Sequence, residues 1–131
     1  MKDSEEPDLK NSMVLDDFRL SLRGKDYRPI MIGGMGVDIS SSALALEAAR
    51  LGAIGHISDA MAPYVVDRKF RTKFQHTKMS KYKTLQKLGQ ETLIQWDPEA
   101  VYKAQLLHIQ STMDAKRGDG AIFANVMEKL T

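Results

Sequence analysis

A glycine-rich turn holds the residues best suited to bind a small molecule. An apolar run over residues 30–32 is followed directly by Gly33, Gly34 and Gly36. Such a run is typical of a buried strand in a parallel sheet, and glycines at its carboxyl end let a ligand approach the backbone. Met35 adds a soft, polarizable side chain. The pattern indicates a small-molecule site at the carboxyl ends of parallel strands, although a tight turn without a ligand fits the same spacing.

The elements that must position this turn form one strand–helix–strand unit. Serines 40–42 offer N-caps for a helix, and Leu44, Ala48 and Leu51 have the spacing of its apolar face. Residues 53–57 form the second strand. We expect a right-handed crossover between the two strands, as in other parallel sheets.

A second candidate site residue lies in the strand predicted over residues 121–127. Asn125 is the one polar residue of this otherwise apolar run. A buried amide needs hydrogen-bond partners, so Asn125 is a candidate for ligand binding. An Asn at a frayed strand end would give the same pattern.

Two further elements are predicted from local signals. Residues 18–22 alternate between apolar and polar side chains, and residues 24–26 form a turn, which together predict a small hairpin. Asp97 and Pro98 are typical of a helix start. The buried face expected for that helix consists of Tyr102, Leu106, Ile109 and Met113.

Two stretches, residues 29–58 and about 97–127, resemble a known family. The sequences PIMIGGMGVDIS (29–40) and ALEAARLGAIGHIS (45–58) resemble the amino-terminal end of the nitronate monooxygenase (2-nitropropane dioxygenase-like) family, and IFANVM (122–127) is similar to its third strand. The resemblance implies an FMN-dependent TIM barrel that oxidises alkyl nitronates with oxygen. It also implies that the turn formed by Gly34, Met35 and Gly36 lies against the flavin, and that Asn125 hydrogen-bonds FMN.

The length of the chain limits what this resemblance can mean. A TIM barrel typically needs about 250 residues, and the chain has 131. We therefore expect an α/β fold made of the first β/α units of an incomplete (β/α)8 barrel, over residues 18–131. Residues 1–17 are expected to form an acidic, largely disordered tail, and the hairpin is expected to cap the amino-terminal mouth of the barrel.

No catalytic residue is assigned. The family's catalytic His segment is absent from the sequence, so the resemblance implies a chain that is inactive alone. We interpret His56 as a partly buried strand residue, and His76 and His108 as surface or packing residues. Asp38 and Asp59 both lie near strand carboxyl ends, where they could meet.

Composition excludes several classes of protein. The chain has a net charge of +2 and no Cys. The absence of Cys excludes disulfides, cysteine nucleophiles and thiolate metal sites. No apolar run approaches the roughly 20 residues of a membrane span. The charged first residues do not resemble a secretory signal. We predict a cytoplasmic protein with no membrane partner and no metal.

Residues 59–96 are interpreted as an insertion after the second strand, with a turn at residues 62–64. From Arg68 to Lys87 the sequence holds eight Lys or Arg and no Asp or Glu. A solvated, partly helical excursion is the favoured interpretation. A surface that binds phosphate or nucleic acid, or a cover for the flavin or an anionic substrate, stays open.

Three functions follow from these observations. The first is the amino-terminal part of an FMN-dependent oxidoreductase with a small nitronate-like substrate. The second is a non-enzymatic remnant or half-barrel that associates with itself or with a complementing chain, because its last strand would have an unpaired edge. The third, a basic protein that binds anions or nucleic acid through Arg68 to Lys87, ranks last and predicts strongly salt-dependent binding.

Overall fold

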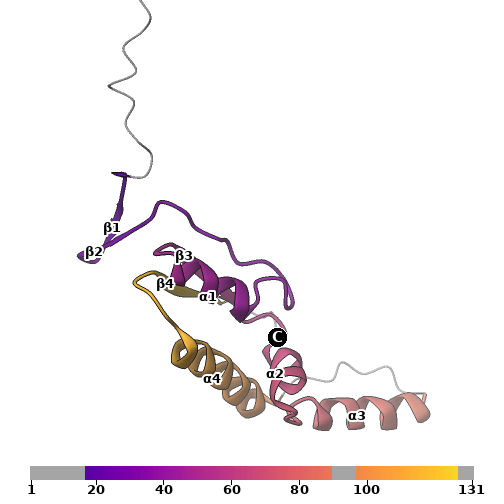
Figure 1. Ribbon diagram of the computed structural model, residues 1–131. Helices are drawn as coiled ribbons and strands as arrows, with labels where there is room; N and C mark the ends of the chain where they lie inside the picture. The colour runs from indigo at the N-terminus through magenta and orange to yellow at the C-terminus, as the bar shows by residue number, and fades with distance from the viewer. Residues whose placement is uncertain (1–16, 90–96, 127–131) are drawn as a thin grey trace, which may run out of the picture.

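Two parallel strands form the centre of the fold. The computed structural model describes residues 17–89 and 97–126. In it β3 (Ile54–Ser58) pairs with β4 (Ala121–Asn125), with Ile54 opposite Ala121 and Ser58 opposite Asn125. Both strands were predicted, and these predictions are confirmed. The chain therefore has a mixed α/β fold, with its parallel strands flanked by helices (Figure 1).

The segment over residues 30–32 lies along the other side of β3. Met31 forms a parallel bridge with Ile54, the Ile32 N–H donates to the Ile54 carbonyl at 2.9 Å, and the Ile54 N–H donates to the Ile30 carbonyl at 3.0 Å. The prediction of a buried strand here is wrong in one respect, because Ile30 and Met31 are 58% and 51% exposed. Only β3 pairs with this segment in the described ranges, so a single bridge forms.

Helix α1 (Ser42–Arg50) begins as predicted but packs through a different face. Its N-cap is Ser41, whose side chain accepts a hydrogen bond from the Leu44 N–H at 3.3 Å. The predicted apolar face is wrong at two of its three residues: Ala48 is buried, but Leu44 and Leu51 are exposed. The buried residues are Ala45, Ala48 and Ala49. The helix lies so close to β3 that a Cβ on Gly55 would be 2.5 Å from the Ala45 Cα, and only small residues fit such a contact.

Helix α4 (Pro98–Ala115) shows the same shift of face. Asp97 caps it by accepting from the Glu99 N–H at 3.1 Å, as predicted. The buried residues are Ala104, His108 and Thr112. The predicted face is wrong, because each of its four residues is at least 39% exposed: Tyr102, Leu106, Ile109 and Met113.

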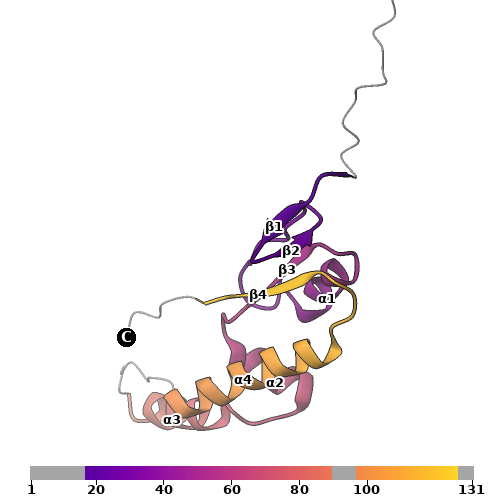
Figure 2. The same ribbon diagram turned by 90° about the vertical axis from the view of Figure 1, so that its left-hand side faces the viewer.

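Helix α2 (Ala62–Phe70) belongs to the core. The predicted turn at residues 62–64 is wrong, because α2 begins there with Pro63 in its first turn. Ala62 and Val66 pack against Ala104 of α4, with Phe74 and Leu107 partly buried beside them. The first part of the predicted insertion is therefore structural, and the helix pair α2–α4 runs below the strands in Figure 2.

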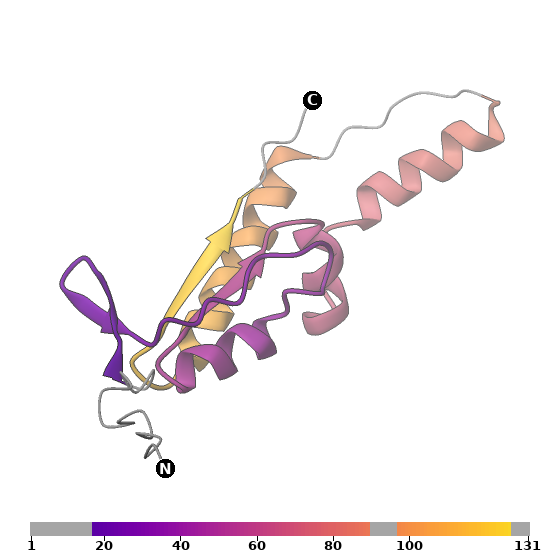
Figure 3. The same ribbon diagram turned by 90° about the horizontal axis from the view of Figure 1, so that it is seen from above.

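Helix α3 (His76–Lys87) fits the interpretation of a solvated excursion better. Its described side chains are exposed or half-exposed. It projects away from the sheet and from α4 in the views of Figures 1 and 3.

The predicted hairpin is confirmed, with a different turn. Strand β1 (Leu20–Leu22) pairs antiparallel with β2 (Lys25–Tyr27), and Arg23 and Gly24 form the turn. The Arg28 N–H donates to the Gly52 carbonyl at 2.8 Å. Because Gly52 lies just before β3, the hairpin stands at the amino-terminal ends of the parallel strands. The predicted acidic tail lies almost wholly outside the described residues.

Asp67 joins α2 to the start of α3. Its carboxylate accepts hydrogen bonds from the Thr72 hydroxyl at 2.6 Å and from the backbone N–H groups of Phe74 and Gln75, each at 2.9 Å. Burial alone would raise the pKa of Asp67, but these hydrogen bonds outweigh it and hold the pKa below its usual value. The ionised carboxylate therefore stabilises the folded chain.

We expect Asp67→Asn to lower the free energy of unfolding at pH 7 by about 1–2 kcal/mol, because the amide has one acceptor oxygen where both carboxylate oxygens now accept, and its NH2 group cannot accept from the donors on that side. A lowered folded pKa contributes stability above the unfolded pKa of about 3.9 and loses it as pH falls through the folded value. The difference between variant and parent should therefore shrink below about pH 4. Urea unfolding followed by circular dichroism measures it. Asp119→Asn, at an exposed carboxylate, is the matched control; an equal loss there would contradict the prediction.

Candidate functional site

The predicted site residues Gly34 and Asn125 lie against each other. A Cβ placed on Gly34 would be 2.7 Å from both Cβ and Nδ2 of Asn125. Asn125 ends β4, and the Asp59 N–H donates to its carbonyl at 3.2 Å. The glycine turn and the strand amide therefore form one surface at the carboxyl ends of the parallel strands.

Ser40 holds the turn in shape. Its side chain is buried, its hydroxyl donates to the Gly33 carbonyl at 3.2 Å, and the Met35 N–H donates to the hydroxyl oxygen at 2.5 Å. This role was missed in the sequence, where Ser40 was grouped with Ser41 and Ser42 as a helix cap. The signal available was its position five residues after Met35, on the far side of the turn.

The turn presents open surface at Gly33, Met35 and Gly36. Nothing lies within 4 Å of a Cβ placed on Gly33 or Gly36, and the Met35 side chain is 61% exposed. A flat ring can approach such a surface, so these residues fit a flavin. The Met35 N–H already donates to Ser40, so Met35 would contact a cofactor through its side chain.

Both α1 and α4 cover one face of the strand pair. Alternate residues of a strand point to the same face, and Gly55 faces α1 while Ile57 and Ala124 face α4. The other face carries Asn125, together with His56 and Phe123. The candidate cofactor surface therefore adjoins the face that these helices leave open.

His56 belongs to that open face and is partly buried, as predicted. Its Nδ1 lies 2.7 Å from the Ile32 carbonyl, and its ring meets Phe123 edge-on with centroids 5.4 Å apart. A carbonyl can only accept, so Nδ1 carries the hydrogen and donates it. These contacts fix the ring and link the segment over residues 30–32 to β4.

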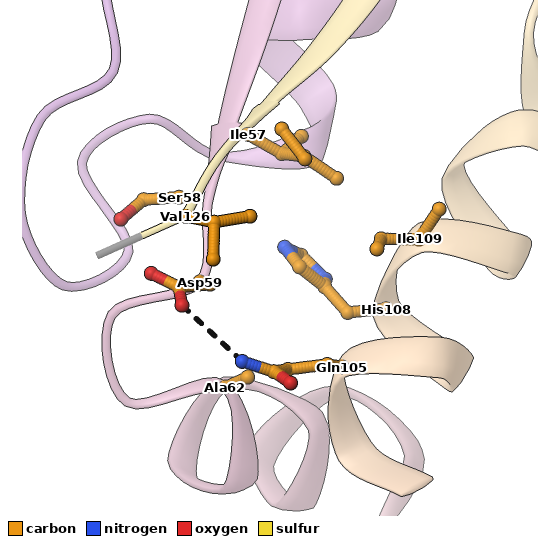
Figure 4. Close-up of a pocket in the computed structure, with 9 residues that line it drawn as sticks. Ile57, Ser58, Asp59, Ala62, Gln105, His108, Ile109 and Val126 are labelled. Atoms are coloured by element: carbon orange, nitrogen blue, oxygen red, sulfur yellow. Dashed lines mark hydrogen bonds between the residues drawn. The ribbon is translucent and has the colours of Figure 1, made fainter. Parts of the chain in front are cut away.

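A pocket of about 80 Å³ lies on the helix-covered face, and we call it the helix-side pocket. It is lined by Ile57, Ser58, Asp59, Ala62, Gln105, His108, Ile109, Ala124 and Val126. Figure 4 shows the His108 ring projecting from α4 toward the strands, with Gln105 donating to Asp59 across the pocket. This Nε2 to Oδ2 hydrogen bond is 3.2 Å long.

His108 is the most enclosed polar group of this pocket. It is 3% exposed, and its Nδ1 has no hydrogen-bond partner in the described part of the chain. Burial lowers the pKa of His108, the Lys69 charge lowers it further, and the Asp38 charge opposes the shift. The imidazole is therefore neutral at pH 7. The interpretation of His108 as a packing residue is confirmed, but its place in a pocket was missed.

The two aspartates near strand ends engage different partners. Asp38 pairs with Arg68 through Oδ2 and Nη1 at 3.3 Å, whereas Asp59 accepts from Gln105. Lys69, next to Arg68, donates to the Ser42 hydroxyl at 2.9 Å. Two of the eight basic residues counted in the sequence are thus used to attach α2 to the region around α1.

Metal and membrane sites find no support in the described residues. Over residues 17–89 and 97–126, no three His, Asp or Glu side chains gather closely enough to hold a metal ion. None of the helices in these same ranges has both the length and the apolar character needed to cross a membrane.

A scan of protein-family models, a search of curated proteins and a search of solved structures each gave no match to this chain. Functional assignment therefore depends on the residues themselves: the contact between Gly34 and Asn125, the open turn, and the resemblance carried by residues 29–58 and about 97–127.

Proposed function

We propose that this chain forms the amino-terminal part of an FMN-dependent oxidoreductase of the nitronate monooxygenase type. The observation that carries the proposal is the contact between Gly34 and Asn125. The resemblance assigned both residues to one flavin site, although they lie far apart in the sequence. Their contact at the carboxyl ends of the strands is where a flavin site of a β/α barrel would lie.

The strand order supports a β/α barrel. The segment around Met31, β3 and β4 lie side by side in chain order, all parallel. Both covering helices lie on one face of the pair, as they do outside a barrel wall. The opposite face keeps Phe123 39% exposed, which suits a wall that further strands would close. We propose that the chain supplies the first three strands, in a cytoplasmic enzyme.

Each site residue has a role in this proposal. FMN, when bound, supplies the redox chemistry for a small nitronate-like substrate. Gly36 leaves room for the ring to approach, Gly34 lets the Asn125 side chain lie against the turn, and the exposed Met35 side chain packs against the ring. The Asn125 amide donates or accepts a hydrogen bond at the cofactor edge. No residue here is assigned to proton transfer, so we expect no turnover by this chain alone.

We expect FMN to bind the purified chain saturably, with a change in flavin absorbance and fluorescence. Gly34→Val combined with Met35→Ala should abolish binding, because the valine side chain would displace the Asn125 side chain and the contact of Met35 would be lost. Asn125→Ala should weaken binding about tenfold, the effect of one hydrogen bond to a buried site. Lys83→Ala, on exposed α3, should bind as the parent does. A folded chain that binds no FMN would refute this proposal.

A second function is favoured by the exposed apolar residues of β4 and α4. Among described residues, β4 pairs with β3 alone, and Val126 at its end is 71% exposed. The stripe on α4 that includes Tyr102 and Leu106 is also exposed. A half-barrel that associates with a second chain would cover these surfaces. Concentration-dependent assembly of a chain that binds no FMN would favour this function over the first.

A further inference from the structure

Helix α4 carries an apolar stripe on its outer side, which we call the α4 stripe. Its members are between 39% and 64% exposed: Tyr102, Leu106, Ile109 and Met113. The buried side of the helix is a different one, formed by Ala104, His108 and Thr112. In Figure 2, α4 lies in front of α2, on the outside of the fold. A continuous apolar stripe that stays exposed in one chain is typical of a contact surface.

The spacing of the α4 stripe is that of a coiled-coil seam. Intervals of four, three and four residues place its members alternately at the d and a positions of one heptad. Continued by one step in each direction, the same register places Glu99 at an a position and Lys116, the C-cap residue, at a d position. The seam therefore ends in an acidic residue at one end and in a basic residue at the other.

The end charges select how two such seams can pair. The Glu99 side chain is 72% exposed, although Lys103 pairs with it at 2.7 Å. Lys116 Nζ donates to the Gly118 carbonyl at 2.7 Å, which is an uncharged acceptor. In a parallel pair of α4 helices, like charges would meet at both ends. In an antiparallel pair, Glu99 of each copy would lie beside Lys116 of the other, because a two-fold axis exchanges the ends of the seam.

We infer that the chain forms a two-fold symmetric dimer in which the two α4 helices pack antiparallel through the α4 stripe. Leu106 of each copy contacts Ile109 of the other, and Tyr102 of each copy contacts Met113 of the other. The partner is a second copy of this chain, because the stripe is complementary to itself in its apolar layers and in its end charges. The inference rests on the second function proposed above, for which it names the partner, and it does not depend on FMN binding.

The length of the α4 stripe sets the strength of the dimer. Eleven residues of helix separate Tyr102 from Met113, which is about 16 Å. A seam of this length is shorter than the contact surface of a stable dimer, so we expect a dissociation constant on the order of 0.1 mM. Sedimentation velocity of the full chain between about 10 µM and 1 mM should show the mass rise toward twice that of the monomer.

Leu106→Glu tests the apolar part of the seam. It places two carboxylates beside the two-fold axis, so the variant should stay monomeric up to about 1 mM, with an unchanged circular dichroism spectrum because Leu106 is exposed. Leu88→Glu, at an apolar residue that is 65% exposed and lies outside the seam, is the matched control and should dimerise as the parent does.

The end charges are tested by exchange. Glu99→Lys or Lys116→Glu alone should weaken the dimer about tenfold, because each change replaces two attractive contacts with two repulsive ones. An equimolar mixture of the two variants should recover the affinity of the parent, since opposite charges meet at both ends of the mixed dimer. A loss of folding in either variant would not be repaired by mixing.

Single cysteines report the orientation, because the chain has no Cys of its own. A mixture of Tyr102→Cys and Met113→Cys chains should be linked by a short thiol cross-linker. Either chain alone should not, because about 16 Å along the helix axis separates its two cysteines. Efficient cross-linking of each chain to itself would indicate a parallel pair and overturn the inference.

Two further outcomes would also overturn it. A parent chain that stays monomeric up to about 1 mM would leave the α4 stripe to a different partner. A dimer that persists in Leu106→Glu but is lost in Val126→Glu would place the contact at the end of β4. In that case the second proposed function would stand and only the α4 interface would fall.

Discussion

Gly55→Ala is expected to lower the free energy of unfolding by about 3 kcal/mol. The added Cβ would lie 2.5 Å from both the Cα and the carbonyl oxygen of Ala45, which are backbone atoms of α1 and cannot rotate away. The helix would have to move off β3, and the buried contacts of Ala48 and Ala49 would loosen with it. Urea or thermal unfolding of the purified variant measures the loss.

The matched control for this substitution is Gly33→Ala. Nothing lies within 4 Å of a Cβ at Gly33, so this change should stay within about 0.5 kcal/mol of the parent. A Gly55→Ala chain as stable as the Gly33→Ala chain would show that α1 does not pack on β3 at the distance described.

Ala104→Leu is the second change with a large expected effect, about 2–3 kcal/mol of destabilisation. Ala104 is fully buried, and it packs against Ala62 and Val66 where α4 meets α2. Three additional carbons at this point would push the two helices apart. Chemical unfolding followed by circular dichroism gives the difference in free energy.

Leu106→Ala provides the opposite test on the same helix. Leu106 is 49% exposed, so its truncation should cost no more than about 0.5 kcal/mol. If the face predicted from the sequence were the buried one, Leu106→Ala would instead cost about 3 kcal/mol, a typical loss for truncating a buried Leu. A severe loss at Leu106 with a tolerated leucine at position 104 would show that the predicted face is the buried one.

The faces of the helices could not be predicted because close packing here selects small residues. Periodicity gives weight to large apolar side chains such as Leu44 and Tyr102, yet the helices approach their partners through Ala45 and Ala104. Which small residue is buried depends on the partner surface, such as the bare backbone of Gly55. Local signals were more reliable: the caps at Ser41 and Asp97 and the two strands were predicted.

The candidate site was predictable only in part. The turn at Gly34 and the amide of Asn125 were predicted from residue type and resemblance, and the structure brings them together. The helix-side pocket was not predictable, because Asp59, which follows β3, and His108 of α4 come to line one pocket only when α4 packs against α2. Helix α2 supplies this packing. It lies in the stretch that was interpreted as a basic insertion because of its charge, so its structural role was missed.

The pairing of β3 with β4 determines the order in which the chain can fold. Ile54 can pair with Ala121 only after α2, α3 and α4 have been synthesised. The pairing of β3 with β4 therefore closes a long loop. Such non-local parallel pairings are slow to form because the entropy of closure is lost before the contact is gained. On the ribosome, one edge of β3 would stay unpaired until β4 is synthesised, after all three intervening helices. Packing of α2 against α4 shortens the loop that must close before β4 can pair with β3. Helix α2, which lies in the segment that interrupts the β/α pattern, therefore also favours formation of the sheet.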